Sequence, residues 1–174
     1  METTILTVPG MGGSGSDHWQ TLWEQADPRF RRVEQRDWDQ PVMFEWVMTL
    51  EQALRDLEGP GVLVGHSLGC LVIVEAAANH PGDIVGALLV APPDFDRMEG
   101  AGQTPMSTLP FPSIVVTSEN DPWVSAERAE EFGFAWGSRF VNIGPAGHIN
   151  ADSGYGTWPE GRQLLDNLPE SAFQ

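Results

Sequence analysis

The chain has 174 residues, of which 41% are hydrophobic and 20% charged, a composition typical of a globular protein. Its formal net charge of −16 comes from 25 acidic residues against nine basic ones, all of them arginine. Because binding to nucleic acid or to an anionic membrane surface needs a basic surface, this charge argues against both kinds of partner. We expect a single domain spanning residues 1–174.

The chain contains a single cysteine, Cys70, so it has no disulfide of its own and no zinc site built from a cysteine cluster. Its first residues lack a basic region followed by a long apolar core. No apolar run approaches the length of a membrane span. A cytoplasmic location is the resulting expectation.

Short apolar runs rich in β-branched residues alternate along the chain with longer segments of helical periodicity. Strands are expected at residues 3–8, 30–34, 61–64, 85–90, 114–117 and 140–143. Helices are expected at residues 18–26, 42–57, 68–79, 126–132 and 160–168. Such alternation is typical of a parallel sheet covered by helices. The expected fold class is therefore α/β, a three-layer α/β/α sandwich around a mainly parallel sheet of about six strands.

Several of the expected helices carry start signals. Asp17, followed three residues later by Gln20, predicts a capping box at the first helix. Pro41 and Pro159 suit a first helical turn, and Ser125 is a candidate N-cap.

A glycine-rich loop, Val-Pro-Gly-Met-Gly-Gly-Ser at residues 8–14, follows the first expected strand. A phosphate-binding loop needs a different glycine spacing and a lysine, which the chain lacks. The other interpretation is an oxyanion loop, in which the backbone N–H groups of Met11 and Leu68 together stabilise a developing negative charge.

The helix after this loop begins with three notable side chains. Trp19 and Trp23 share one face at helical spacing, for which packing in the core is the default. His18 opens the helix beside the glycine-rich loop and is a candidate pocket residue.

Residues 61–78 predict a strand, a sharp turn and a helix. The turn, Gly-His-Ser-Leu-Gly at residues 65–69, matches the G-x-S-x-G pattern that lifts a nucleophilic serine out of a sheet. Gly65 and Gly69 leave room for the turn, and the helix N-terminus after Ser67 stabilises negative charge. Ser67 is therefore the candidate nucleophile, with an ordinary turn and a capping serine as the alternative. Cys70, inside an apolar helix, is typical of a buried packing thiol.

Residues 91–112 form a long irregular segment with five prolines. A loop of this length usually covers a site or is mobile, and it is too short for a separate cap domain. Apolar side chains in or near it form an acyl pocket or cover the sheet edge, and both interpretations stay open: Phe95, Met98, Met106, Phe111 and Trp123.

A serine nucleophile needs a base, and a carboxylate to orient that base. Asp121 lies just past the end of the expected strand 114–117, and Asp94 and Asp96, after the preceding strand, are its rivals. The alternative for Asp121 is an ordinary turn residue before a proline, with no catalytic role.

His148 follows the last expected strand in a glycine-containing loop and is the candidate base. His66 lies within the turn, which is expected to point it away from the site, and His80 precedes a proline at a helix end. The chain order Ser67, Asp121, His148 is that of an α/β-hydrolase, and all three follow the carboxyl ends of strands. A surface loop histidine is the alternative for His148.

With these motifs the chain resembles the small serine hydrolases of the retinoblastoma-binding protein 9 type, a compact branch of the α/β-hydrolase superfamily. The resemblance spans nearly the whole chain and is carried by Pro-Gly-Met-Gly-Gly-Ser (9–14), His18-Trp19 with Trp23, Gly-His-Ser-Leu-Gly-Cys (65–70), Glu-Asn-Asp-Pro-Trp (119–123), Gly-His-Ile-Asn (147–150), Ser153-Gly154 and Trp-Pro-Glu-Gly (158–161). It implies a compact α/β-hydrolase fold without a large cap domain, and a triad of Ser67, Asp121 and His148. It implies neither a substrate nor the protein partner in the family name.

These residues predict a serine hydrolase that cleaves carboxylic esters, or related acyl derivatives, of small molecules through an acyl-enzyme on Ser67. No metal or organic cofactor is expected. An amidase or peptidase using the same triad is one alternative. A non-catalytic module that binds a ligand or a protein on a hydrolase scaffold is another, and protein partners are unknown.

Overall fold

The computed structural model describes residues 3–79, 82–97 and 103–169. Within them, six strands form one sheet in the order β2-β1-β3-β4-β5-β6, and each neighbouring pair is parallel. The strands are β1 (Thr4–Val8), β2 (Phe30–Arg32), β3 (Gly61–His66), β4 (Ile84–Val90), β5 (Ser113–Thr117) and β6 (Arg139–Asn142). The expected six-stranded parallel sheet is confirmed, with element ends shifted by one or two residues, as is usual for strand boundaries.

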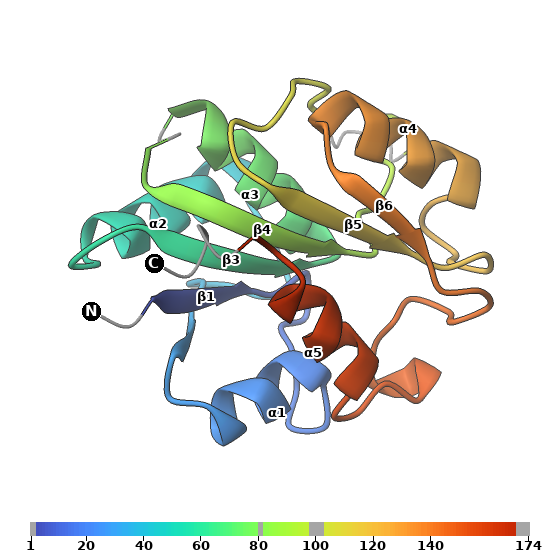
Figure 1. The fold of residues 1–174 in the computed structure, drawn as a ribbon, viewed down its shortest axis with the longest axis horizontal. Helices are drawn as coiled ribbons and strands as arrows, with labels where there is room; N and C mark the ends of the chain where they lie inside the picture. Colours follow the sequence, from blue (N-terminus) through green and yellow to red (C-terminus); the bar gives the residue numbers. More distant parts are fainter. Residues whose placement is uncertain (1–2, 80–81, 98–102, 170–174) are drawn as a thin grey trace.

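Helices cover both faces of this sheet (Figure 1). The helices are α1 (Trp19–Ala26), α2 (Met43–Arg55), α3 (Leu68–Asn79), α4 (Ala126–Trp136) and α5 (Pro159–Asp166), with short 3₁₀ turns η1 (Phe95–Arg97) and η2 (Ala151–Ser153). Helices α1 and α5 lie on one face, and α2, α3 and α4 on the other. This is the expected three-layer α/β/α sandwich. None of the helices in the described ranges is long and apolar enough to cross a membrane.

Two apolar clusters, one on each face of the sheet, form the core. The cluster under α1 and α5 is rich in tryptophan: the Trp19 ring lies 4.7 Å from that of Trp23 and 5.2 Å from that of Trp158. The other cluster joins α2, α3 and α4 and includes the stacked rings of Phe132 and Trp136. The expected packing of Trp19 and Trp23 in the core is therefore confirmed.

The start of α1 differs from the sequence prediction. Its N-cap is His18, whose Nδ1 accepts a hydrogen bond of 3.2 Å from the Gln20 backbone N–H. The Gln20 side chain is buried, where it accepts from the Ser14 hydroxyl at 2.6 Å and donates to the Val64 carbonyl at 2.9 Å. The capping box predicted from Asp17 is wrong because the core holds the Gln20 side chain.

The other helix-start predictions have mixed outcomes. Pro159 is the first residue of α5, and Ser125 caps α4 by accepting from the Arg128 N–H at 3.2 Å, as predicted. Pro41 precedes α2, which begins at Met43, so its placement in a first helical turn is wrong.

The described parts of the irregular segment 91–112 pack on α4. The Trp136 ring N–H donates to the Pro105 carbonyl at 2.7 Å, and the Trp136 carbonyl accepts from the Leu109 N–H at 2.9 Å. Phe95 and Phe111 are buried in the cluster beneath α4. These two rings therefore pack against the core on this face of the sheet. Met106 is exposed, and Met98 lies outside the described residues.

Candidate active site

Ser67 occupies the single residue between β3 and α3. Its φ is +52°, a conformation that costs energy for any residue with a side chain, so the surrounding structure must hold it. The Ser67 N–H donates to the Val90 carbonyl at 2.9 Å, and the Ser67 carbonyl accepts from the Cys70 N–H at 2.9 Å. The predicted strand–turn–helix setting of Ser67 is therefore confirmed.

Three glycines make this turn sterically possible. A Cβ at Gly69 would lie 1.9 Å from the Val8 carbonyl oxygen, and one at Gly65 would lie 2.8 Å from a side chain of α3. A Cβ at Gly10, in the glycine-rich loop after β1, would lie 2.8 Å from the Cβ of Ser67. The first two glycines were predicted from the motif. Gly10 shows in addition that the loop runs directly against the turn.

The three predicted triad residues lie in one hydrogen-bonded chain. His148 Nε2 is 2.9 Å from Ser67 Oγ, and His148 Nδ1 is 2.9 Å from Asp121 Oδ2 and 3.1 Å from Oδ1. The Asp121 side chain is fully buried, whereas that of His148 is 12% exposed. Because a carboxylate only accepts, Nδ1 carries the ring proton in neutral His148 and Nε2 faces the serine hydroxyl as an acceptor.

The rival acids take part in a different interaction. Asp94 is buried with its Oδ1 3.4 Å from Arg128 Nε, and Asp96 accepts a hydrogen bond from the same guanidinium group. Neither carboxylate is bonded to His148 in the described structure.

Within the described part of the chain, the alternative nucleophile, Cys70, and the other histidines do not belong to the triad. Cys70 is buried with its Sγ 3.3 Å from the Val90 carbonyl, and burial raises the pKa of its thiol, as expected for a packing residue. The His66 ring is buried and bonds to the His148 carbonyl at 2.9 Å. It therefore faces the loop of residues 143–150 that carries His148, here called the base loop, contrary to expectation. His80 lies outside the described residues.

Two positioning side chains, Ser118 and Asn120, were missed by the sequence analysis. Asn120 Oδ1 accepts from the Gly147 N–H at 2.7 Å and from the Ser118 hydroxyl at 2.9 Å. The Ser118 Oγ also accepts from the Ala146 N–H at 2.9 Å. Small polar residues after a strand often form hydrogen bonds to backbone groups, so their presence indicates such bonds but not the partners. The sequence could not show that their partners lie 27 and 28 residues further along the chain.

The glycine-rich loop and the start of α3, which carry the two predicted oxyanion residues, both lie beside Ser67. Leu68 is the first residue of α3, so its N–H has no acceptor within the helix. The position that a Cβ on Gly10 would occupy is 3.3 Å from the Leu68 nitrogen, which places Gly10, the residue before Met11, beside this amide.

His18 and Met11 line the same open recess, whose volume is about 390 Å³. Asp17, Asn150 and Asp152 line it too, so its wall is largely polar. His18 itself is buried, and its Nε2 has no hydrogen-bond partner among the described residues. Burial, and secondarily Arg32 and His148, lowers the pKa of His18 to about 4, so the ring is neutral at pH 7.

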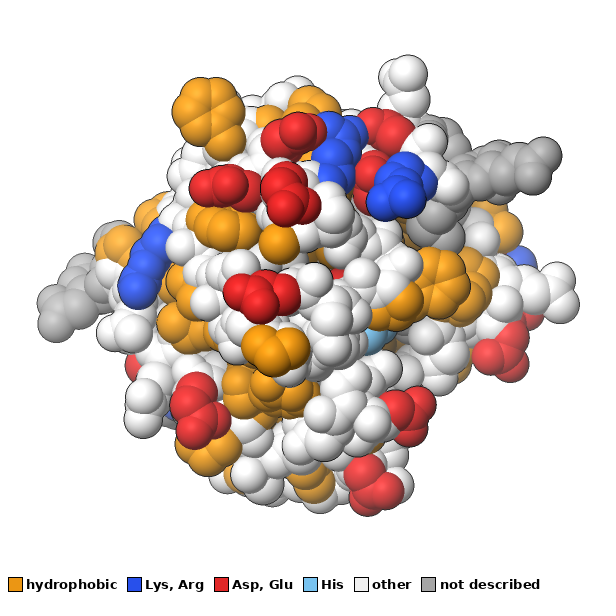
Figure 2. All heavy atoms as spheres, turned by 90° about the vertical axis from the view of Figure 1, so that its right-hand side faces the viewer, with side chains coloured by type: hydrophobic (Ala, Val, Ile, Leu, Met, Phe, Trp, Pro, Cys, Tyr) orange, Lys and Arg blue, Asp and Glu red, His pale blue; other side chains and the backbone are white. Residues whose placement is uncertain are grey.

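Trp123, the second predicted pocket residue, does not line this recess. It is 48% exposed, and its ring lies 6.5 Å from that of His148. Figure 2 looks onto the face where the strands end, and a histidine is visible there beside exposed apolar side chains. Trp123 is thus an exposed ring near His148 and outside the recess.

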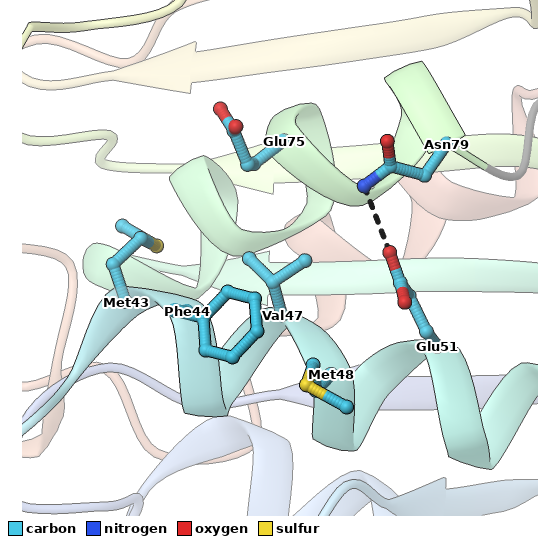
Figure 3. Close-up of a pocket in the computed structure, with 7 residues that line it drawn as sticks. All are labelled: Met43, Phe44, Val47, Met48, Glu51, Glu75 and Asn79. Carbon is cyan, nitrogen blue, oxygen red and sulfur yellow. Dashed lines mark hydrogen bonds between the residues drawn. The ribbon is translucent and has the colours of Figure 1, made fainter.

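A second cavity, of about 370 Å³, lies between α2 and α3 (Figure 3). Met43, Phe44, Val47 and Met48 form its apolar part, and Asn79 donates to Glu51 across its edge at 2.9 Å. No triad residue lines this cavity, so it is separate from the candidate active site.

Across residues 3–79, 82–97 and 103–169, no group of three or more histidine, cysteine or acidic side chains is arranged to hold a metal ion.

A parallel sheet with helices on both faces, and a serine raised at the carboxyl end of its third strand, together define an α/β-hydrolase. The family model for serine hydrolases matches residues 5–167, and the chain belongs to this serine hydrolase family. It is therefore a hydrolytic enzyme.

Solved structures agree with this assignment. The structure is similar to that of a protein described as a YdeN-like hydrolase from Pectobacterium atrosepticum, with a TM-score of 0.93 and 35% identity over 99% of this chain and 94% of that chain. It is also similar to the ydeN gene product of B. subtilis (TM-score 0.77, 17% identity, 94% of this chain and 97% of that one). Est1E from Butyrivibrio proteoclasticus shares the fold, with a TM-score of 0.67 and 16% identity over 94% of this chain and 87% of that one. Among curated proteins, none matches the chain significantly.

Proposed function

We propose that this hydrolase cleaves carboxylic esters, or related acyl derivatives, of small molecules through an acyl-enzyme on Ser67. The observation that carries the proposal is the unbroken chain from Asp121 through His148 to Ser67, with a shortest contact of 2.9 Å at each link. This is the distance range in which a base can take a proton from a nucleophile.

In the acylation step, Ser67 Oγ attacks the ester carbonyl carbon while His148 Nε2 takes the hydroxyl proton. Asp121 holds the imidazole through Nδ1 and stabilises the imidazolium that forms. When the tetrahedral intermediate collapses, the bond to the alcohol breaks and His148 returns the proton to the leaving oxygen. The acid remains as an ester of Ser67.

Deacylation repeats these steps with water as the nucleophile. His148 takes a proton from water, the hydroxide attacks the acyl carbon, and the bond to Ser67 Oγ breaks as His148 returns the proton to it. The N–H groups of Met11 and Leu68 donate to the negatively charged oxygen of both tetrahedral intermediates, at the N-terminus of α3, where the helix dipole favours negative charge. The reaction as proposed uses neither a metal nor an organic cofactor.

The recess lined by Met11 and His18 is the proposed place for part of the substrate. Asp17 and Asp152 line it, and the chain carries a net charge of −16, so neutral substrate groups fit better than anionic ones. Trp123 is proposed to contact the substrate from the side of His148. The narrower kinship with the retinoblastoma-binding protein 9 type also remains a proposal, supported by the motifs that suggested it.

The direct test compares wild type with Ser67→Ala on a panel of short-chain aryl esters. We expect wild type to turn them over and Ser67→Ala to lose about 10⁴-fold or more in kcat without losing its fold. Turnover that survives the substitution unchanged would contradict the proposal and favour a module that only binds a ligand or a protein.

Amide or peptide hydrolysis is the second candidate, because the same three residues perform both reactions. Aryl amides with the same acyl groups as the esters separate the two. Faster turnover of the amides than of the matched esters would identify an amidase.

A further inference from the structure

The His66 ring connects the nucleophile to the loop that carries the base. Its Nε2 lies 2.9 Å from the His148 carbonyl oxygen. Because a carbonyl only accepts, His66 carries a proton on Nε2 and donates it. The two imidazole rings also pack against each other, with centroids 4.9 Å apart. His66 is joined by a peptide bond to Ser67. The segment that carries the nucleophile therefore also contacts the residue that acts as its base.

The backbone around His148 adopts a conformation that needs such support. Gly147 has a φ of +57° and Ile149 a φ of +49°, so His148 lies between two residues in the left-handed region. That region is unfavourable for a β-branched residue such as Ile149. Contacts from outside the loop must therefore hold the backbone in place.

Side chains from several parts of the chain supply these contacts, among them Asn120, which accepts from the Gly147 N–H. The His148 N–H donates to Ser153 Oγ at 3.2 Å, and the Ile149 carbonyl accepts from the Trp19 ring N–H at 2.9 Å. The His148 carbonyl is held by His66, the contact that comes directly from the nucleophile turn. Losing this donor would leave a carbonyl of the base itself without its partner.

We propose that His66 is a positioning residue, which holds the His148 backbone so that the imidazole stays within reach of Ser67. The inference rests on the proposed function, since it concerns how the base of that reaction is placed. Catalysis is sensitive to such placement, because a displacement of about 1 Å costs about 10²-fold in rate. His66 itself does not contact the substrate in this account. Burial, together with His18 and His148, lowers the pKa of His66 well below its ordinary value, which keeps the ring neutral.

The test compares two substitutions of similar size. In His66→Gln, the side-chain N–H₂ is as many bonds from Cβ as Nε2 is in histidine, so it can donate to the same carbonyl. His66→Phe keeps a ring but has no donor. On a short-chain aryl ester, we expect His66→Phe to lose about 10- to 100-fold in kcat, with KM changed less than threefold. We expect His66→Gln to recover most of that loss.

The outcomes separate the inference from the proposed function. If wild type turns over no ester, the proposed function fails. If wild type is active and the two variants are equally active, or differ only in thermal stability, the positioning role of His66 is wrong. If His66→Phe does not fold, NMR of wild type labelled with ¹³C,¹⁵N-histidine decides. A neutral His66 ring with its proton on Nε2, coupled across the hydrogen bond to the His148 carbonyl, supports the role, and a proton on Nδ1 overturns it.

Discussion

The nucleophile turn and the base loop lie side by side, yet different forces hold them. Ser67 is fixed by packing between β3 and α3, where Gly65 and Gly69 leave no space for a side chain. His148 lies in a loop, and hydrogen bonds from polar side chains hold its backbone. The packed half of this site, around Ser67, thus depends on close approach at two glycines, whereas the polar half, around His148, depends on a network of polar side chains. The two halves should therefore fail differently.

The largest effect is expected from Gly69→Ala, which changes the closely packed turn around Ser67. The new Cβ would meet the Val8 carbonyl of β1, a strand that is paired on both sides and cannot move aside. We expect the free energy of unfolding to fall by about 3 kcal/mol or more, with loss of ester turnover. Urea unfolding measures the change. Gly59→Ala is the control because a Cβ there meets open space, and equal stability of the two variants would refute the steric explanation.

Acid should weaken the fold as a whole through His18, the buried N-cap of α1 beside the site. The pKa of His18 is lowered to about 4, so between pH 6.5 and pH 4 the unfolded chain binds a proton that the folded one does not. His18 therefore leaves the free energy of unfolding unchanged above about pH 6.5. Below that pH, the free energy of unfolding falls by about 3 kcal/mol as the pH approaches 4. His18→Asn keeps an N-cap side chain but cannot titrate.

Urea unfolding of wild type and His18→Asn across this pH range isolates the contribution of His18 from that of the carboxyl groups. We expect the stability difference between the two proteins to shift in favour of the variant as the pH falls. Parallel curves would show that His18 does not resist protonation in the folded protein.

A smaller effect is expected from Asn120→Ala, which removes the acceptor for the Gly147 N–H. The loop around His148 would then lose one of its bonds to the loop that carries Asp121, while the bond from the Ala146 N–H to Ser118 remains. We expect kcat to fall about 10- to 100-fold while KM changes little. Asn79→Ala removes a comparable side-chain bond at the far end of α3 and should leave kcat within about twofold of wild type. The polar network would have no part in placing His148 if both variants behaved alike.

The smallest effect is expected from Trp123→Ala, which leaves both halves of the site intact. The ring is largely exposed and near His148, so we expect KM for aryl esters to rise less than about tenfold, with stability within about 0.5 kcal/mol of wild type. Phe134→Ala, at an even more exposed ring on α4, serves as the control. A fall in kcat rather than a rise in KM would assign Trp123 to the placement of His148 instead of to substrate contact.

The sequence predicted those features of the fold and the site that depend on residues close together in the chain. The alternation of strands and helices, and the turn around Ser67, depend on neighbouring residues, so periodicity and glycine spacing predicted the six-stranded sheet and the setting of the nucleophile. Asp121 and His148 were chosen by their places after strands, and the structure brings both to Ser67.

The sequence could not predict contacts between distant residues. Ser118 and Asn120 look like ordinary turn residues until their partners, 28 and 27 residues away, are known. The inward direction of His66 depends on a loop 82 residues further along the chain. For Gln20, the buried contacts with Ser14 and Val64 replaced a local capping pattern. In each case contacts with distant residues decided the outcome, and local sequence patterns carry no information about such contacts.

Covalent labelling with a fluorophosphonate tests the central claim most directly, because the reagent reacts with a serine only when a base activates it. The account predicts that intact-mass measurement finds one adduct per chain, that peptide mapping places it on Ser67, and that Ser67→Ala and His148→Ala react far more slowly. A folded wild-type protein that remains unlabelled, or that carries the adduct on another residue, would contradict it.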